Sequence, residues 1–433
     1  QNRNWVLTEL FPQIEVTGRY SRIDKNQAEI SAGFTPEQSS SVGASLSQLI
    51  FNDPIWSSYR SASRLVESRQ LELESLRLDI QHAAESLFIE SLAARSVLTI
   101  ESANLDFSRG NLGIARTRME VGASGPDEVY RWKSRIAREE VSVLQNYKLL
   151  KDLMIDLNKV MGVSQATDWK LEDIGRDNPD SGFSAEAFEE FLSDRDSLKV
   201  LKEFAFITAI AHAPEMKALK KAIDAEEIML SQSERSFIMP EVEAFFDYDH
   251  TIDQDYAGNN LFEELAEAGV VLDPGPSDDD NHWQVGVEAR IPLFSGGGKI
   301  VDIKRRKAEV RRLKDLYNRA LQTVEKRVAA AVAALETARP QIDFSRTASE
   351  MAQKNLKIIK NQYAEGTASI LRLLDAQTNA LIQARSVALA RYRYQRAVTD
   401  FLRAISWRSF NDSGPGQSAW FRKLRERIKK ERE

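Results

Sequence analysis

The stretch that follows Pro54 limits the possible folds more than any other part of the sequence. From there to about Val121 it contains no proline, and its glycines, Gly110 and Gly113, lie near its end. A helix of roughly 65 residues would be about 100 Å long, which a compact domain cannot contain. The apolar spacings of three and four are typical of a helix that packs along one stripe, and they involve Ala62, Leu65, Leu73, Leu76, Ile80, Ala83, Leu87, Ala94, Leu98, Leu105 and Leu112.

A second helix is predicted to follow and to complete a hairpin. The sequence GASGP at 122–126 interrupts the first helix, and Pro126 suits the first turn of the next, which we expect to end before Gly162. A second hairpin is predicted after SGGGK, with helices over about 299–364 and up to about 405, interrupted at Gly366. The pairs Phe51/Phe294 and Gly122/Gly366 have almost the same separation along the chain, which indicates an internal two-fold repeat.

Four segments around these helices alternate in polarity with a period of two, which predicts β-strands over 12–21, 41–48, 240–249 and 281–291. One face of each strand is apolar and the opposite face is polar or charged. This pattern is typical of a lipid-facing, water-filled barrel, and equally of a sheet with one face on a core and the other in solvent. Four strands cannot close a membrane barrel, so the first interpretation requires several chains.

Composition removes several classes of function. The chain has no cysteine, which excludes disulfides, thiolate zinc sites and cysteine nucleophiles, and it has no apolar run long enough for a membrane helix. The SGGGK segment does not match a phosphate-binding loop. The four histidines are scattered; His282 with the acidic run 278–280 could bind a divalent cation, but a solvated acidic loop is favoured. We find no catalytic constellation, and predict that the protein is not an enzyme and has no cofactor or metal site.

One long segment carries a family resemblance. Residues 362–406 closely resemble the last helix of TolC-like outer-membrane factors, with RMEVGASGPDEV (118–129) as the paired motif of the first repeat. The segments IPLFSGG (291–297) and AHAPEMKAL (211–219) resemble the strand-to-helix junction and the turn before a long helix in that family. The residues that match the pattern of the last helix are Tyr363, Gly366, Leu373, Leu374, Asp375, Ala376, Ala384, Arg385, Ala390, Tyr392 and Tyr394.

This resemblance implies a mixed α/β membrane protein that forms a homotrimer. Each protomer would give four strands to a 12-stranded outer-membrane β-barrel, and its helical coiled-coil hairpins would form an α-barrel in the periplasm. Such a trimer is an exit duct for efflux or type I secretion, and it docks a periplasmic adaptor (membrane fusion) protein and an inner-membrane transporter. The transported substrate stays open. A soluble coiled-coil tether or scaffold of the cell envelope is the alternative, which would need no detergent for extraction.

The expected organisation has six parts. Strands 1 and 2 lie in 11–51, the first tunnel hairpin in 54–163, a linker with equatorial helices in 164–238, strands 3 and 4 in 239–294, the second tunnel hairpin with the inner gate in 297–406, and a linker with a basic tail in 407–433. The family begins with a helix before its first strand; its counterpart in the second repeat is expected over about 203–237. We therefore expect that this chain lacks its own start, including any signal peptide. For the tail, a disordered end is favoured over a helix on the bundle or on an anionic surface.

The resemblance also suggests functional positions. Arg372 stands at one position of the family's acidic constriction and Asp375 keeps the other, and we expect Glu128 or Asp127 to form an ion pair with Arg372. The expected gate comprises Asp127, Glu128, Tyr363, Gly366, Thr367, Arg372 and Asp375. Adaptor docking at the hairpin tips is expected to involve Gly122, Ala123, Ser124, Gly125, Gly366, Thr367, Ala368 and Ser369. The expected lipid face of the barrel comprises Val16, Tyr20, Val242, Phe246, Tyr248, Trp283, Val285 and Val287.

Overall fold

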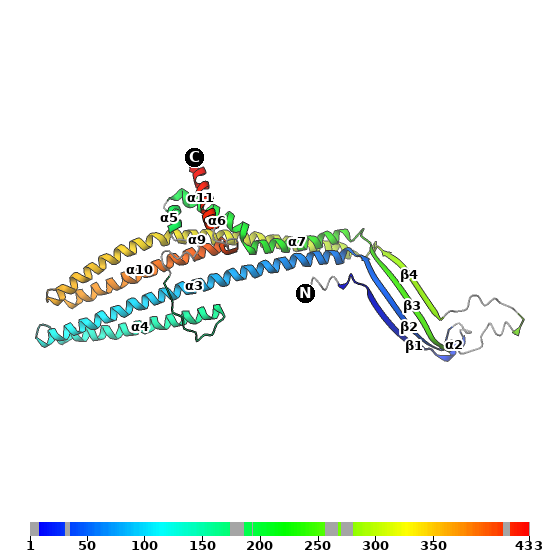
Figure 1. Ribbon diagram of the computed structural model, residues 1–433, viewed down its shortest axis with the longest axis horizontal. Coiled ribbons are helices and arrows are strands. Elements are labelled where there is room, and N and C mark those ends of the chain that lie inside the picture. Colours follow the sequence, from blue (N-terminus) through cyan, green and yellow to red (C-terminus); the bar gives the residue numbers. More distant parts are fainter. Residues whose placement is uncertain are drawn as a thin grey trace. The chain divides into compact units, whose positions relative to one another are not determined.

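The computed structural model describes residues 8–30, 35–173, 186–192, 194–255, 267–269, 280–409 and 416–432. The chain forms two compact units (Figure 1), of which the first comprises residues 1–69 and 219–316 and the second comprises 70–218 and 317–433. Three helices contribute residues to both units: α3 (Asp53–Glu120), α7 (Pro214–Arg235) and α9 (Gly298–Ala364).

The first unit contains an antiparallel sheet in the order β1-β2-β3-β4 (Figure 1). Its strands are β1 (Gln13–Arg22), β2 (Gln38–Phe51), β3 (Glu241–Asp255) and β4 (Asn281–Arg290), and the short helix α2 (Lys25–Ile30) connects the first two. The four predicted strands are therefore confirmed. Because the pairing is antiparallel and in register, side chains of like polarity line up across the sheet. One row on the apolar face consists of Ile14, Leu46, Phe246 and Val285, and the neighbouring polar row consists of Glu15, Ser45, Asp247 and Gln284.

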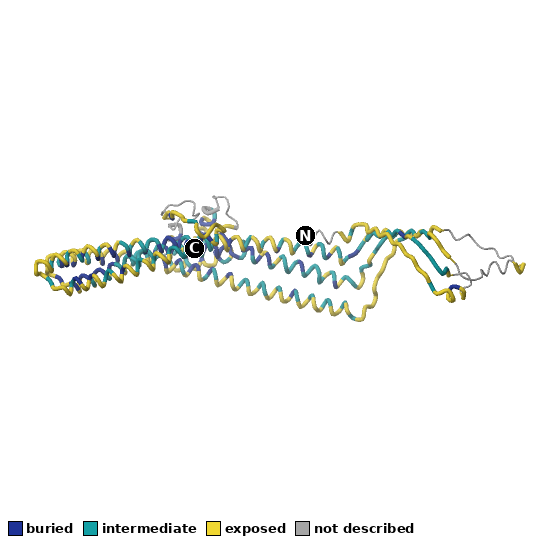
Figure 2. Tube along the Cα trace, turned by 90° about the horizontal axis from the view of Figure 1, so that it is seen from below, coloured by how far each residue is buried: buried dark blue, intermediate teal, exposed yellow. Residues whose placement is uncertain are grey.

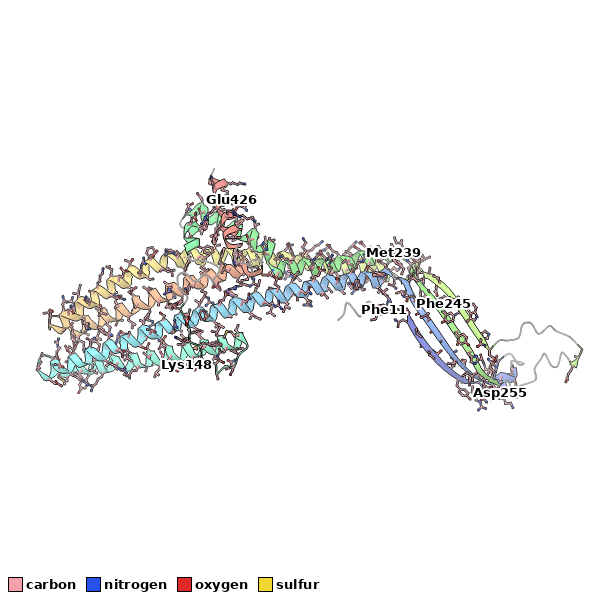
Figure 3. The ribbon with its side chains drawn as sticks, viewed as in Figure 1. Phe11, Lys148, Met239, Phe245, Asp255 and Glu426 are labelled. Atoms are coloured by element: carbon pink, nitrogen blue, oxygen red, sulfur yellow. The ribbon has the colours of Figure 1, made fainter. Side chains whose placement is uncertain are left out.

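Two glycines let side chains cross the polar face of this sheet. A Cβ on Gly43 would lie 2.6 Å from a carboxylate oxygen of Asp249 and 3.0 Å from the hydroxyl of Thr17. A Cβ on Gly286 would lie 2.8 Å from the ring of Phe245, the residue paired with it on β3. Phe245, labelled in Figure 3, breaks the polar pattern of its strand, and Gly286 explains how its ring is accommodated there.

Polar contacts join the helices of the first unit. Arg235 of α7 donates to Asp53 of α3 at 3.0 Å, and Arg306 of α9 pairs with Glu226 of α7 at 3.0 Å. Lys221 of α7 lies 2.6 Å from Glu67 of α3. Few apolar side chains are buried in the described part of this unit, among them Ala225 and Val310. Ion pairs thus connect the helices of this unit, and many of its large apolar side chains are exposed. Figure 2 shows how few residues of this unit are buried.

The second unit contains two helical hairpins. In Figure 1, α3 lies alongside α4 (Pro126–Met161), and α9 lies alongside α10 (Ile370–Ala404). These four helices form two helical hairpins, as the sequence predicts. The helix α9 continues without interruption through Pro340.

The main core of the second unit lies where shorter helices pack on the second hairpin. The helices α5 (Glu186–Leu192), α6 (Arg195–His212) and α11 (Gly416–Arg432), with a 3₁₀ turn at Trp407–Ser409, surround fully buried Phe401 and Leu335. The single helix expected over about 203–237 is divided, because Pro214 cannot donate a backbone hydrogen bond and starts α7 instead. The tail that was expected to be disordered is the helix α11, since it can bury an aromatic face in this core.

Candidate functional site

Both hairpins turn with the same backbone geometry. Gly122 and Gly366 have φ of 75° and 80°, a left-handed conformation that glycine adopts at the least cost. The amides of Gly122 and Ala123 donate to the carbonyls of Met119 and Arg118, as in a Schellman motif. The next helices begin differently: Pro126 occupies the first turn of α4 without a side-chain cap, whereas Ser369 caps α10 by accepting from the amide of Arg372. The repeat thus determines the turn, while each copy has its own start signal.

A hydrophobic cluster lies directly behind these turns and joins the two hairpins. Trp132, Tyr363 and Leu373 are fully buried in it, and they come from α4, α9 and α10. Ala368 is also buried here, although it belongs to the tip residues expected to dock an adaptor. The cluster consists of Ala115, Val129, Trp132, Ile359, Tyr363, Ala368, Ile370, Leu373 and Ala376.

Tyr363 connects the hairpins through specific polar contacts. Its hydroxyl donates to the Oε2 of Glu128 at 2.9 Å and accepts from the indole N–H of Trp132 at 3.5 Å. The guanidinium of Arg118 lies 4.8 Å from the centre of the Tyr363 ring and donates to its backbone carbonyl. The Nε of Arg118 lies 3.8 Å from Glu128, and both side chains are largely buried. We call Arg118, Glu128, Trp132 and Tyr363 the tip clasp; it holds the first hairpin against the second.

Burial raises the pKa of the Tyr363 phenol, and the nearby Glu128 carboxylate raises it further by opposing a phenolate charge. Because the pKa of the folded state is the higher one, this contribution to the free energy of unfolding is complete below about pH 10. It is lost as the pH rises through the folded-state value. Burial raises the pKa of Tyr392 as well, so we expect tyrosinate absorbance to show late-ionising phenols, one of which is missing in Tyr363→Phe. Protease cleavage near the tips should increase over the same pH range, and identical titrations of the two proteins would contradict this assignment.

Sequence reasoning missed two members of the clasp, Arg118 and Trp132. Arg118 stands within the quoted motif RMEVGASGPDEV, but nothing in the pattern pairs it with the other hairpin. Trp132 continues the apolar spacing of Val129, and that signal could have placed it in the core. Its contact with Tyr363 depends on tertiary packing.

A buried polar cluster lies further along the same helices. The amide of Gln377 on α10 donates to Asn104 at 2.8 Å and to Ser108 at 2.7 Å, both on α3. Asn104 donates to Glu139 of α4 at 2.7 Å, and Arg135 donates to the same carboxylate at 2.6 Å. Gln377 follows Leu373 at the spacing of one helical turn, so a polar residue in an apolar stripe was its signal. The cluster joins three helices through hydrogen bonds that a shift of one helix along another would break.

The predicted gate residues divide into two groups. Glu128 and Tyr363 are brought together in the tip clasp, whereas Asp127, Gly366, Thr367, Arg372 and Asp375 are exposed. The ion pair expected between Arg372 and Asp127 or Glu128 is not formed within the chain. Asp127 lies 3.8 Å from Arg131, and Glu128 is held by Tyr363 and Arg118. Within the described ranges, Arg372 has no carboxylate partner, because it projects from the exposed side of α10.

The residues expected on a lipid face lie on one face of the sheet. Val16, Tyr20, Trp283, Val285 and Val287 are 66–71% exposed, values unusual for large apolar side chains. Val242 and Tyr248 are partly exposed, and Phe246 is 39% exposed. Nothing in the described part of the first unit covers this face, so it is not the inner face of a globular core.

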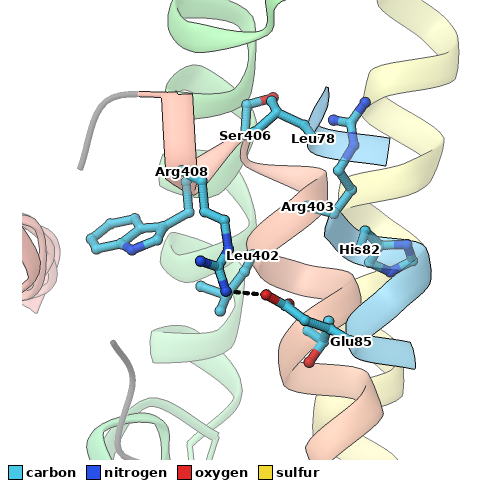
Figure 4. A pocket seen from close by; sticks show the side chains of 9 residues that line it. Leu78, His82, Glu85, Leu402, Arg403, Ser406 and Arg408 are labelled. Carbon is cyan, nitrogen blue, oxygen red and sulfur yellow. Dashed lines mark hydrogen bonds and ion pairs between the residues drawn. The ribbon is translucent and has the colours of Figure 1, made fainter. Parts of the chain in front are cut away.

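Ionic groups line a crevice elsewhere in the second unit (Figure 4). Arg408 pairs with Glu85, His82 lies 2.7 Å from Asp400, and the Nε of Arg403 lies 2.7 Å from Asp79. These pairs join α3 to α10 and to the turn that follows it. These polar contacts connect the two hairpins across the crevice, and one guanidinium nitrogen of Arg403, Nη1, is buried there without a partner among the described residues.

Two further features are absent from the described residues. They contain no group of three or more histidine and acidic side chains placed to hold a metal ion. Among the helices that the structure describes, none combines the length and the apolar character needed to cross a bilayer.

Comparison with known proteins agrees with the resemblance seen in the sequence. Residues 208–405 match the outer membrane efflux protein family. The chain is 27% identical to the outer membrane protein OprJ of Pseudomonas aeruginosa over 140 residues, which are 32% of this chain and 28% of that protein. It is also 27% identical to nodulation protein T of Rhizobium leguminosarum bv. trifolii over 128 residues, which are 29% of this chain and 27% of that protein. These matches span little more than a quarter of the length of the curated relatives.

Solved structures share the fold over a larger part of the chain. VceC of Vibrio cholerae superposes with a TM-score of 0.71 at 14% identity, covering 93% of this chain and 89% of that one. The CmeC outer membrane channel of Campylobacter jejuni superposes with a TM-score of 0.70 at 14% identity, covering 98% and 84%. The predicted mixed α/β fold with long helical hairpins and four strands is thus confirmed. The family match over residues 208–405 and the shared fold thus make the chain similar to outer membrane efflux proteins.

Proposed function

We propose that the protein is a trimeric outer-membrane exit duct for efflux or type I secretion. Its sheet would contribute to a 12-stranded barrel in the outer membrane, and its hairpins would form a periplasmic tunnel that narrows at the tips. An adaptor and an inner-membrane transporter would dock at those tips. The family and the fold support this proposal, since the solved structures that superpose on the chain include outer-membrane channels.

One observation carries the proposal: an open sheet has an uncovered apolar face. The row Ile14, Leu46, Phe246 and Val285 crosses all four strands, and its members are between 38% and 76% exposed. In water such a row would be strongly unfavourable, at about 25 cal/mol for each Å² of apolar surface. A hydrocarbon environment removes that cost, whereas a soluble tether would leave the face in water. The lipid environment is therefore favoured over the scaffold alternative.

The edges of the sheet support assembly with other copies. The outer strands β1 and β4 are both 10 residues long, and each pairs with one neighbour only in the described sheet. Unpaired backbone groups cannot face lipid, so a membrane sheet must close on itself. Pairing β4 of one copy with β1 of the next would close it, and three copies give the 12 strands of the proposed barrel.

The helices also expose apolar residues that a neighbouring chain would cover. On α4, Val141, Leu144, Tyr147 and Ile155 are 45–67% exposed and lie on another side of the helix from buried Trp132. The single chain exposes 26713 Å² of surface. A compact monomer of 49.0 kDa exposes about 17,000 Å². The excess supports burial between chains.

Detergent dependence and oligomeric state test the proposal together. We expect the protein to fractionate with outer membranes, to need detergent for extraction, and to run as a trimer that heating converts to monomer. In planar bilayers it should give discrete conductance steps. A monomer that is soluble in buffer alone would overturn the duct and leave the scaffold.

The internal repeat suggests a role for Arg372 at the tunnel mouth. Arg372 and Glu128 stand at equivalent positions of the two hairpins, six residues after Gly366 and Gly122. Glu128 contacts the second hairpin of its own chain, so Arg372 would face the first hairpin of the next copy. Asp375, exposed three residues later, would lie beside it at the mouth.

Arg372→Glu is expected to change the charge at this mouth by six units in a trimer, two for each copy. We expect the cation-to-anion permeability ratio to rise several-fold and the closed state to become less stable, because like charges would then meet at the constriction. Bilayer conductance and reversal potentials measure both effects. Lys423→Glu on the exposed side of α11 makes the same charge change away from the tips. If both variants change the permeability ratio and the closed state equally, Arg372 is not part of the gate.

A further inference from the structure

The helix α11 (Gly416–Arg432) is fixed to the second unit by one aromatic and aliphatic side. Trp420, Phe421, Leu424 and Ile428 are each at most 9% exposed. The indole N–H of Trp420 donates to the hydroxyl of Thr208 on α6 at 3.2 Å. The ring of Phe421 packs on two phenylalanines of α5, with centroid distances of 5.5 and 5.7 Å. The helix is therefore a built part of the fold and presents its other side in a fixed orientation.

The outward side of α11 is mainly basic, although Glu426 and Glu431 are also exposed on this helix. Arg422, Lys423, Lys429 and Lys430 are exposed, and Arg427 is partly exposed. Arg425 pairs with Glu190 of α5 at 3.0 Å, but in the described part of the chain the other five have no carboxylate within ion-pair distance. Elsewhere this acidic chain, with a net charge of −6, pairs many of its arginines within the bundle. In Figure 3, Glu426 marks this helix. An unpaired basic row in an acidic protein favours an anionic partner.

The chemistry of this side narrows the class of partner. A helix that lies in a membrane surface needs a free apolar face, whereas every large apolar side chain from Trp420 to Ile428 is already buried in the fold. Stable protein interfaces are enriched in aromatic residues and depleted in lysine, and this side shows the opposite. Single-stranded nucleic acid is bound with exposed aromatic rings, which this side does not offer. A flexible polymer with repeated negative charges requires only a row of cations on the surface that binds it.

We propose that the basic side of α11 binds peptidoglycan, whose peptide stems repeat carboxylates along a polymer. This inference rests on the proposed function, because it needs the helical unit to lie in the periplasm. The contact would tether the duct laterally to the cell wall through several weak, screened ion pairs. Each pair alone contributes little, and the row acts by multivalency along the polymer.

Co-sedimentation with purified peptidoglycan sacculi tests this assignment on the full chain in detergent. A variant with glutamine at Arg422, Lys423, Lys429 and Lys430 removes the charge and keeps helix-forming side chains. We expect its apparent affinity for sacculi to fall at least tenfold. Binding of the unchanged protein should also weaken as salt rises from about 0.05 M to about 0.3 M, because the Debye length shortens. A matched variant that exchanges lysine and arginine at the same four positions should bind as the unchanged protein does.

The outcomes separate this proposal from its competitors and from the proposed function. Equal binding of the glutamine variant and the unchanged protein would overturn it. Binding to phosphatidylglycerol vesicles but not to sacculi, lost in the glutamine variant, would assign the surface to a membrane instead. Bilayer conductance is measured on the same samples and should be unchanged in the glutamine variant. A protein that binds sacculi through these residues but never conducts would refute the duct and leave the tether.

Discussion

Replacing Val285 with arginine is expected to abolish assembly of the protein in the outer membrane. Val285 is 68% exposed and belongs to the apolar row that crosses all four strands. An arginine on the lipid face of a barrel costs about 2–4 kcal/mol near the bilayer midplane. Three copies in the proposed trimer would cost about 6–12 kcal/mol, which is comparable to the whole stability of a typical domain. Heat-modifiable trimer in outer-membrane fractions, measured on gels, should disappear.

The neighbouring residue provides the control for this experiment. Gln284 lies on the opposite face of the same strand and donates to Asp247 at 2.9 Å. Gln284→Arg introduces the same side chain where water and a carboxylate can receive it, so trimer yield should stay normal and only ion selectivity should change. Equal loss in both variants would mean that the middle of β4 tolerates no added arginine on either face. Normal assembly of Val285→Arg would show that this face does not meet lipid.

Replacing Tyr363 with phenylalanine is expected to destabilise the closed arrangement of the hairpin tips. The ring still fills its fully buried site, but the hydrogen bond to Glu128 is lost. Hydrogen bonds to charged groups contribute about 1.5–3 kcal/mol, so the closed state of each protomer should be disfavoured by roughly 10- to 150-fold. Conductance of the reconstituted protein should rise, and tip residues should exchange amide hydrogens faster.

Another buried tyrosine, Tyr392 of α10, provides a matched control for Tyr363 of α9. Tyr392 is buried, its hydroxyl donates to Asp173 at 3.3 Å, and it lies in the half of α10 that is farther from the tip. Tyr392→Phe should leave conductance unchanged while removing a comparable bond. If Tyr363→Phe also leaves conductance and tip exchange unchanged, the clasp has no part in gating and is a packing contact only.

The repeat was the strongest source of correct expectations. The spacing of Gly122 and Gly366 predicted two turns, and both glycines have a left-handed backbone conformation. Strand alternation predicted which residues share a face, because the side-chain period of a strand is two. It could not tell lipid from a core, and only the uncovered sheet resolves that question in favour of an open face.

Errors arose where two elements far apart in the sequence meet. The expected ion pair between Arg372 and Asp127 or Glu128 rests on the corresponding positions of the two repeats. In the structure, the Glu128 carboxylate instead contacts Tyr363 and Arg118. In the proposed ring of repeats, equivalent positions would face in the same rotational sense and so would not face each other. The tail was misjudged for a related reason: its charge is visible in sequence, but the pocket for Trp420 is formed by other elements.

The sequence by itself determined the helical hairpins, the strands, their faces and the two glycine turns, because these depend on local periodicity and on backbone conformations that few residues adopt. The tertiary structure alone decided that Tyr363 joins the hairpins through Glu128 and Trp132, and that α11 is docked with its basic side outward. Such contacts bring together residues separated by more than 200 positions, as from Glu128 to Tyr363. Their energy depends on burial and on exact distances, which no spacing rule contains.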